Sequence, residues 1–316
     1  MEIFRRNYLS TALLLFALAA LSFACEAQSK EQSSKLEAIN ELVSTYAEYG
    51  QFNGAILVAH EGELVYKQGF GLANMEWEIP NQTDTKFRLG SISKQFTAML
   101  IMQLVAEGKL ELNAPLARYL PDYPKENAER ITIHQLLTHS AGVPNNYDSP
   151  KPKVDKPDLI IPDNYRPQDL VAVFSGLPLD FTPGVRFSYS NSGYVVLGYL
   201  IEQITEKSFA QVLEEKILQP LGMKNTGIEK HRPLSANRAA GYFQAWGTYY
   251  NANYVDMSSV FSAGAIYSTV EDLWLWDQAL YEEKLLPKAY LAQIFSQQIS
   301  DPDYGGHYGY GWSLTD

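Results

Sequence analysis

The stretch Gly90-Ser91-Ile92-Ser93-Lys94-Gln95-Phe96 places a serine and a lysine three positions apart at the start of a strongly apolar segment. A serine hydroxyl is a poor nucleophile and needs a base within hydrogen-bond reach. Residues i and i+3 share one face of a helix, so a helical start at Ser91 would bring the Lys94 amine beside the serine oxygen. Gly90 suits a sharp entry turn. We therefore identify Ser91 as the candidate nucleophile and Lys94 as its candidate base.

The residues that follow predict a helix which ends at Gly108. Its apolar positions recur near the helical period and would bury one stripe: Ile92, Phe96, Met99, Leu100, Leu104 and Val105. A serine and a lysine at this spacing are common in proteins, so the motif by itself is only a hypothesis. The rest of the chain has to support it.

The composition excludes several classes of protein. A chain of 316 residues with 46% hydrophobic residues can bury one large core or two lobes. The net charge of −11 argues against nucleic acid as a partner and against adsorption to an anionic membrane surface. The single cysteine excludes an intramolecular disulfide and a cysteine-based zinc site. We expect no metal and no cofactor.

The N-terminus predicts export. Arg5 and Arg6 precede an apolar run from Leu9 to Ala24, which is typical of a signal peptide over residues 1–24. Cys25 then resembles the lipidation site of a bacterial lipoprotein, followed by a polar tether to residue 34. Ordinary signal-peptidase cleavage and a twin-arginine signal are the alternatives. All three readings export the protein. We expect it in the periplasm or cell envelope, with membrane contact only through the lipid anchor of the lipoprotein reading.

The remaining pattern suggests an α/β fold interrupted by an all-helical lobe at roughly 110–260. A helix is expected over 36–49, and a hairpin from Gly54–His60 and Glu63–Phe70. The proline-dense stretch 144–167 is expected to be a long loop that gates a cleft or covers the lobe. Further helices are predicted over 132–138, 169–174, 193–205, 209–218 and 270–280, and strand or extended loop over the aromatic run 242–254.

A second motif, Tyr189-Ser190-Asn191, follows a Thr-Pro-Gly turn and precedes a helical run. A tyrosine hydroxyl beside a lysine amine can relay protons, and an asparagine amide can both donate to a carbonyl and accept from the lysine. The alternative is a capped helix start with an aromatic packed beside it, because Ser and Asn are good N-caps.

Together, Ser91-x-x-Lys94 and Tyr189-x-Asn191 resemble the penicillin-recognising serine hydrolases, the group of class C β-lactamases, DD-peptidases and related esterases. The resemblance runs from about residue 36 to the end of the chain, which defines a hydrolase domain over 35–316. It implies a β-lactamase/transpeptidase-like fold, in which helices flank an antiparallel sheet. Further stretches carry it: Phe70-Gly71-Leu72-Ala73, Leu136-Leu137-Thr138-His139-Ser140-Ala141-Gly142, Pro220-Leu221-Gly222-Met223 and Ser262-Ala263-Gly264.

The resemblance also implies a reaction. An exported serine hydrolase would act through an acyl-serine at Ser91 on an amide or ester, in a D-amino-acid peptide, an ester or a β-lactam. Tyr189 would move the proton to the leaving group, and Asn191 would orient Lys94 and the substrate. Because members of the group are broad, we expect a peptidase or esterase rather than a dedicated β-lactamase. The expected binding partner of this protein is a small-molecule or peptide substrate.

One part of the group's pattern is not found. A third motif, Lys or His followed by Thr or Ser and then Gly, should follow Tyr308-Gly309-Tyr310-Gly311-Trp312, but the sequence ends at Asp316. Lys224–Gly227 and His139–Gly142 are similar in letters but wrongly placed. We expect incomplete C-terminal strands, with residues 308–312 as an unpaired edge. The competing hypothesis is a non-catalytic lipoprotein that uses the fold to bind or sense a ligand.

Three histidines and one aromatic run receive structural interpretations. His134 and His139 are five positions apart, unlike the i, i+4 pair that shares one helix face for a metal. We expect both to be structural and His307 to be a surface residue. The aromatics of 242–254 are expected in a core or hairpin face, with a substrate cleft as the alternative.

Overall fold

The structure is a computed structural model that describes residues 33–145, 165–301 and 305–315. The expected signal peptide (1–24), Cys25 and residues 146–164 of the proline-dense stretch lie outside the described residues. The chain divides into two compact units, with the boundary between Gln82 and Thr83.

The first unit contains a helix over residues 33–48 and two antiparallel strand pairs. The hairpin has the expected boundaries, and its connection Glu61-Gly62 has positive φ at both positions (53° and 79°), as a two-residue hairpin turn requires. Residues 33 and 34, expected in the tether, are already helical. The strands are β1 (Gly54–His60), β2 (Glu63–Phe70), β3 (Leu72–Asn74) and β4 (Ile79–Pro80).

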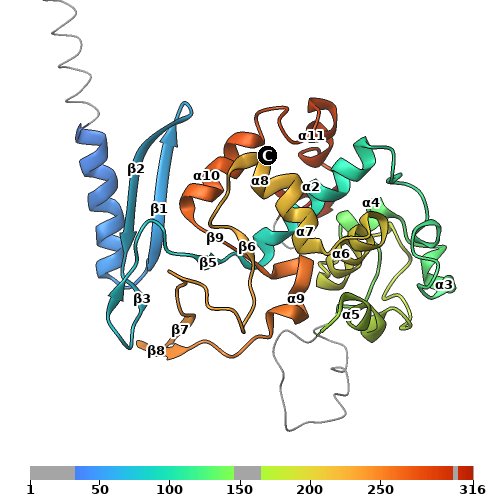
Figure 1. The fold of residues 1–316 in the computed structure, drawn as a ribbon, viewed down its shortest axis with the longest axis horizontal. Helices are drawn as coiled ribbons and strands as arrows, with labels where there is room; N and C mark the ends of the chain where they lie inside the picture. The colour runs from blue at the N-terminus through green and yellow to red at the C-terminus, as the bar shows by residue number, and fades with distance from the viewer. Residues whose placement is uncertain (1–32, 146–164, 302–304, 316) are drawn as a thin grey trace, which may run out of the picture. The chain divides into compact units, whose positions relative to one another are not determined.

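The second unit holds the candidate site and is mainly helical (Figure 1). Its central helix α2 contacts α6, α7, α9 and α11. The helices and helical turns are η1 (Gly90–Ile92), α2 (Ser93–Ala106), η2 (Leu116–Arg118), α3 (Lys125–Ala128), α4 (Ile133–Leu137), α5 (Pro167–Phe174), α6 (Asn191–Thr205), α7 (Phe209–Leu213), the π-helical turn η3 (Glu214–Leu218), α8 (Gln219–Leu221), α9 (Met257–Gly264), α10 (Val270–Ala279) and α11 (Lys288–Ile294).

Its strands are short and pair antiparallel, in the orders β5-β9-β6, β7-β8 and β10-β11-β12. Within 110–260, strands β6 to β8 lie between α8 and α9, so this part of the chain is not all-helical as expected. The strands are β5 (Phe87–Arg88), β6 (Gly227–Ile228), β7 (Tyr242–Ala245), β8 (Thr248–Asn251), β9 (Ile266–Ser268), β10 (Ile299–Asp301), β11 (Gly306–Tyr308) and β12 (Ser313–Leu314).

The expectation of an unpaired edge at residues 308–312 is wrong. Strand β11 lies between β10 and β12 and pairs with both. The chain reverses at Gly311, whose φ is +82°, and the Gly309 amide donates to the Trp312 carbonyl at 2.8 Å. The left-handed conformation of Gly311 therefore lets the chain fold back and cover its own strand.

Helix α2 is buried on nearly all sides rather than along one stripe, because other helices surround it. Its polar residues therefore need partners inside the core. The Ser93 hydroxyl accepts from the Ile266 amide at 3.1 Å, and the Thr97 hydroxyl donates to the Ser262 carbonyl at 2.7 Å. These bonds fix α2 against β9 and α9.

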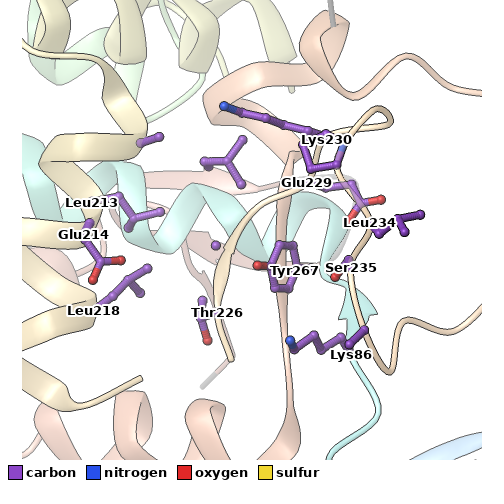
Figure 2. A pocket seen from close by; sticks show the side chains of 15 residues that line it. Lys86, Leu213, Glu214, Leu218, Thr226, Glu229, Lys230, Leu234, Ser235 and Tyr267 are labelled. Carbon is purple, nitrogen blue, oxygen red and sulfur yellow. The ribbon is translucent and has the colours of Figure 1, made fainter. Parts of the chain in front are cut away.

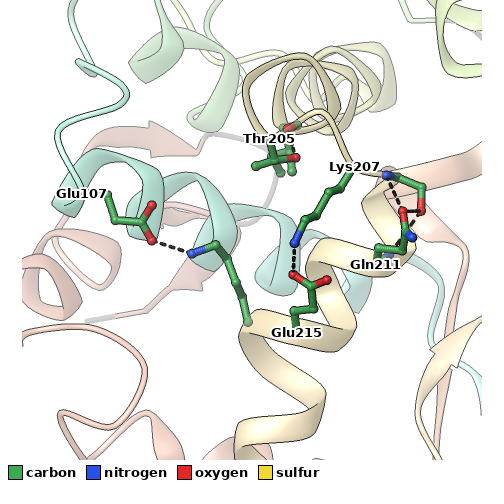
Figure 3. Close-up of polar contacts among 8 residues, drawn as sticks. Glu107, Thr205, Lys207, Gln211 and Glu215 are labelled. Atoms are coloured by element: carbon green, nitrogen blue, oxygen red, sulfur yellow. Dashed lines mark hydrogen bonds and ion pairs between the residues drawn. The ribbon is translucent and has the colours of Figure 1, made fainter.

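Ion pairs link the outer ends of these helices (Figure 3). Glu107, just after α2, pairs with Lys216 of η3, and Lys207 pairs with Glu215. The side chains of the second pair are about half exposed, at 48% and 50%. Pairs of this kind contribute about 0–1 kcal/mol each. The buried contacts of α2 therefore determine the position of the site far more than these surface pairs.

Gly198 marks the closest approach of α6 to α9. A Cβ at this position would overlap the Ser262 hydroxyl and the Phe261 ring. Gly198→Ala should lower the free energy of unfolding by about 1–3 kcal/mol through overpacking, although alanine is the better helix former. In the matched control Gly193→Ala, the new Cβ would lie 3.5 Å from the nearest atom, an ordinary contact. Denaturant unfolding of both variants tests this; equal stability of the two would contradict the packing argument.

Candidate active site

Ser91 lies in the η1 turn that leads directly into α2, and its side chain is exposed. Gly90 before it has φ +54°, a left-handed conformation that favours glycine. Lys94 follows in the first turn of α2 and is 1% exposed. As the spacing predicts, the two side chains meet, with 3.1 Å between Lys94 Nζ and Ser91 Oγ. An accessible hydroxyl thus stands over a buried amine.

The Lys94 amine has two further partners, and both are carbonyl oxygens. It donates to Asn191 Oδ1 at 2.8 Å and to the Ala263 carbonyl at 2.9 Å. Its nitrogen lies 4.8 Å from the centre of the Tyr189 ring and 5.6 Å from that of Tyr194. Burial disfavours the charged form and lowers the pKa of Lys94 to about 7. A substantial fraction of the amine is therefore neutral at neutral pH.

Tyr189 and Asn191 contact the Ser91–Lys94 pair from either side of the residue that caps α6. Ser190 is the N-cap of α6, and its hydroxyl accepts from the Gly193 amide at 3.4 Å. The residues on either side of the cap both reach the site. The Tyr189 hydroxyl donates to Ser91 Oγ at 2.7 Å, while Asn191 accepts from Lys94. The capped helix start is therefore present, with Ser190 as the cap, and both flanking residues contact the Ser91–Lys94 pair.

Helix α9 supplies a contact that the sequence analysis missed. Phe261 breaks the helix, with φ +39° and ψ −130°, in the left-handed half of backbone space that non-glycine residues rarely adopt. Beyond the break, the carbonyls of Ser262 and Ala263 accept from Thr97 and Lys94 of α2. The Ser262-Ala263-Gly264 motif was noted in the sequence. Every residue has a backbone carbonyl, however, so residue types do not identify the one that accepts from the lysine.

The two histidines near α4 are buried or half-buried and pair with tyrosines. His134 Nδ1 lies 2.9 Å from the Tyr310 hydroxyl, and His139 Nε2 lies 3.2 Å from the Tyr308 hydroxyl. Burial lowers the pKa of each histidine. His139 also contacts the Tyr189 ring, at 4.4 Å between centres, and its link to the site was not predicted.

Other residues considered from the sequence lie elsewhere. Thr226, in the stretch 224–227, bonds with Ser268 and Asp272 within the core. The aromatic run forms the β7-β8 hairpin, with Trp246 at its turn. His307 is half-buried in β11.

A cavity of about 430 Å³ lies between the α7-η3 segment and strands β6 and β9 (Figure 2). Lys86, Glu214, Glu229 and Tyr267 are among the residues that line it. Ser91, Lys94, Tyr189 and Asn191 do not line it. Within the described ranges, no group of three or more His, Cys, Asp or Glu side chains is arranged to hold a metal ion.

Known proteins are similar to this chain in sequence and in fold. The Beta-lactamase family profile matches residues 39–316. A penicillin-binding protein of Bacillus subtilis (strain 168) is 32% identical over 307 residues, which cover 90% of this chain but only 64% of that relative. A penicillin-binding protein structure from Bacillus halodurans has 32% identity and a TM-score of 0.72, over 85% of this chain and 81% of that one.

A D-amino acid amidase from Ochrobactrum anthropi SV3 is also similar in structure. It has 27% identity and a TM-score of 0.67, and the match covers 83% of this chain and 74% of the amidase. The fold is thus the expected β-lactamase/transpeptidase-like arrangement of helices and antiparallel sheets. With a family match over most of its length, the chain belongs to the Beta-lactamase family of serine hydrolases.

Proposed function

We propose that this protein is an exported hydrolase that forms an acyl-enzyme on Ser91 and cleaves an amide or ester bond. The observation that carries the proposal is the position of Ser91 Oγ, 2.7 Å from the Tyr189 hydroxyl and 3.1 Å from the Lys94 amine. A nucleophile, a base and a second proton carrier within hydrogen-bond reach are what acyl transfer by a serine requires.

The partners of Lys94 favour its role as the base. A neutral amine has two hydrogens and one lone pair, and two of the three partners, Asn191 Oδ1 and the Ala263 carbonyl, can only accept. When both hydrogens go to these oxygens, the lone pair turns toward Ser91. The Ser91 hydroxyl can then give its proton to Lys94 while it accepts from Tyr189.

The reaction then proceeds in two halves. Ser91 Oγ bonds to the substrate carbonyl carbon, its proton passes to Lys94, and the carbonyl oxygen takes the negative charge. The Ser91 amide at the start of the η1-α2 helical segment is the proposed donor to that oxyanion. The bond to the leaving group breaks as Tyr189 protonates the departing nitrogen or oxygen and regains a proton from Lys94. A water molecule then gives one proton to the same groups as its oxygen bonds to the acyl carbon. The bond from that carbon to Ser91 Oγ breaks, Oγ takes the proton back, and the acid leaves.

The names of the relatives support the substrate class. Two matched proteins are penicillin-binding, and a third is a D-amino acid amidase. We therefore propose D-amino-acid peptides or amides, simple esters and β-lactams as substrates, with peptidase or esterase activity ahead of dedicated β-lactam hydrolysis. All three pass through the same acyl-serine.

Export and anchoring are part of the same proposal. They rest on the apolar run from Leu9 to Ala24 and on Cys25 as the lipidated residue. Of the helices that the structure describes, none has the length and apolar character to cross a membrane. A membrane-impermeant penicillin probe should label the protein in intact cells, and Cys25→Ala should shift it from the membrane to the soluble fraction. Labelling only after lysis would contradict export.

Ser91 should be the residue that a fluorescent penicillin or fluorophosphonate probe acylates. Ser91→Ala should abolish labelling of the purified protein, because no other group described at this site combines a hydroxyl with contact to both Lys94 and Tyr189. Ser93→Ala is the control, since Ser93 is buried and its hydroxyl accepts a hydrogen bond from the Ile266 amide. Undiminished labelling of the Ser91→Ala protein would contradict the assignment, and an unlabelled wild-type protein would favour a ligand-binding role.

The labelling rate should depend on pH through Lys94. The base must be neutral, so the rate should rise with pH up to the lysine pKa of about 7 and level off above it. In Lys94→Ala, the labelling rate should no longer rise with pH, and it should be about 10²–10⁴-fold lower. Lys230→Ala, which removes a lysine from the separate cavity, should change neither. A loss below about tenfold would make Tyr189 the principal base.

A further inference from the structure

His139 lies in a buried pocket of aromatic rings and is 2% exposed. It follows α4 and has φ +54°, a left-handed backbone conformation that fixes where its side chain points. We call the surrounding rings the His139 cage. Its members are Phe187, Tyr189, Tyr194 and Tyr308.

The histidine holds the segment 188–190 at three consecutive residues. Its carbonyl accepts from the Ser188 amide at 2.8 Å, and its Nδ1 accepts from the Ser190 amide at 3.1 Å. Between these bonds, its ring packs on the Tyr189 ring with centres 4.4 Å apart and planes at 32°. The backbone on both sides of Tyr189 and one face of its ring are therefore set by one residue.

The hydrogen bonds also determine the tautomer of His139. A backbone amide can only donate, so Nδ1 must carry the lone pair and the hydrogen of the neutral ring must be on Nε2. Nε2–H then faces the Tyr308 hydroxyl at 3.2 Å. Burial, and secondarily the charge of Lys94, lower the pKa of His139 well below its ordinary value, so the ring stays neutral. A protonated ring could not accept from Ser190.

We propose that His139 is a positioning residue for the reaction, which holds the Tyr189 hydroxyl on Ser91 through its ring face and its Nδ1 acceptor. This inference rests on the proposed function, because the position of Tyr189 affects the rate only if Ser91 is acylated. His139 itself does not touch Ser91: the path runs from its ring to the Tyr189 ring, and from the Tyr189 hydroxyl to Ser91 Oγ at 2.7 Å.

His134 provides a matched control in the same segment of the chain. Its Nδ1 lies 2.9 Å from the Tyr310 hydroxyl, and the two rings meet edge to face, 5.8 Å apart. Each histidine thus joins the α4 region to a tyrosine of the 308–312 stretch. A role limited to that connection would make the two histidines equivalent, whereas positioning of Tyr189 would belong to His139 alone.

Two substitutions separate the contacts of His139. His139→Phe keeps a ring against Tyr189 but removes the acceptor for the Ser190 amide. His139→Asn removes the ring but keeps an acceptor, because Oδ1 stands at the same place along the side chain as Nδ1. Asparagine also tolerates the left-handed backbone at this position, so the second variant retains the fold if the phenylalanine strains it.

The first measurement needs no activity. Amide hydrogen exchange of Ser190 should be about tenfold faster in His139→Phe than in the wild type, because a buried amide loses its acceptor. His139→Asn should stay within about threefold of the wild type, and so should His134→Asn. An unchanged Ser190 amide in His139→Phe would overturn the proposal whatever the protein hydrolyses.

The second measurement is the labelling rate with a penicillin or fluorophosphonate probe. Both His139 variants should be slowed about 10- to 100-fold, since a displaced reacting group loses rates of this order. In a Tyr189→Phe background, where no hydroxyl remains to be positioned, the same substitutions should slow labelling less than about threefold. His134→Asn should leave the labelling rate of either background unchanged.

The outcomes separate this inference from the proposed function. Equal slowing of the His139 variants with and without the Tyr189 hydroxyl, or equal slowing by His134→Asn, would show a merely structural role and overturn it. Faster Ser190 exchange together with a wild-type protein that takes up neither probe would contradict the acyl-enzyme proposal and, with it, the positioning role in catalysis.

Discussion

The structure around the site depends on one constraint: a lysine amine is buried inside the second unit of the chain. A buried amine must either lose its charge or find partners that stabilise it. Here the two fixed acceptors come from two other helices, Asn191 at the start of α6 and the Ala263 carbonyl of α9. The third neighbour is the nucleophile candidate Ser91, so the arrangement that accommodates the lysine also directs it at the serine.

The packing of three helices follows from this requirement. Helix α2 carries Lys94, and its Thr97 bonds to α9 one residue before Ala263. Gly198 allows α6 to approach α9 closely enough for both to reach the amine. A Cβ on Gly311 would lie only 3.0 Å from the Lys94 carbonyl oxygen, so glycine allows the last described stretch to pack closely against the start of α2. Small residues at the contacts therefore bring the polar groups to one point.

Elements with strong local signals could be predicted from the sequence. The Glu61-Gly62 hairpin, the Ser190 cap, and the pairing of Ser91 with Lys94 all follow from short-range geometry. Contacts over long sequence distances could not be predicted. The Ala263 carbonyl lies 169 residues from Lys94. His139 was interpreted as structural because only its spacing from His134 was considered, and that spacing does not fit a metal site. The unpaired edge at 308–312 was wrong because pairing between short returning strands depends on where glycines allow the turn.

The state of the Lys94 amine is the central claim, and its titration can be observed directly. Protein with ¹³C- and ¹⁵N-labelled lysine gives one resonance that disappears in Lys94→Arg, and its shift can be followed from pH 5 to 11 by nuclear magnetic resonance. Burial between two carbonyl acceptors predicts a midpoint at about 7, well below the ordinary 10.5 of a lysine. A midpoint near 10.5 would mean that the amine is charged at neutral pH, and it would contradict the account of Lys94 as the base for Ser91.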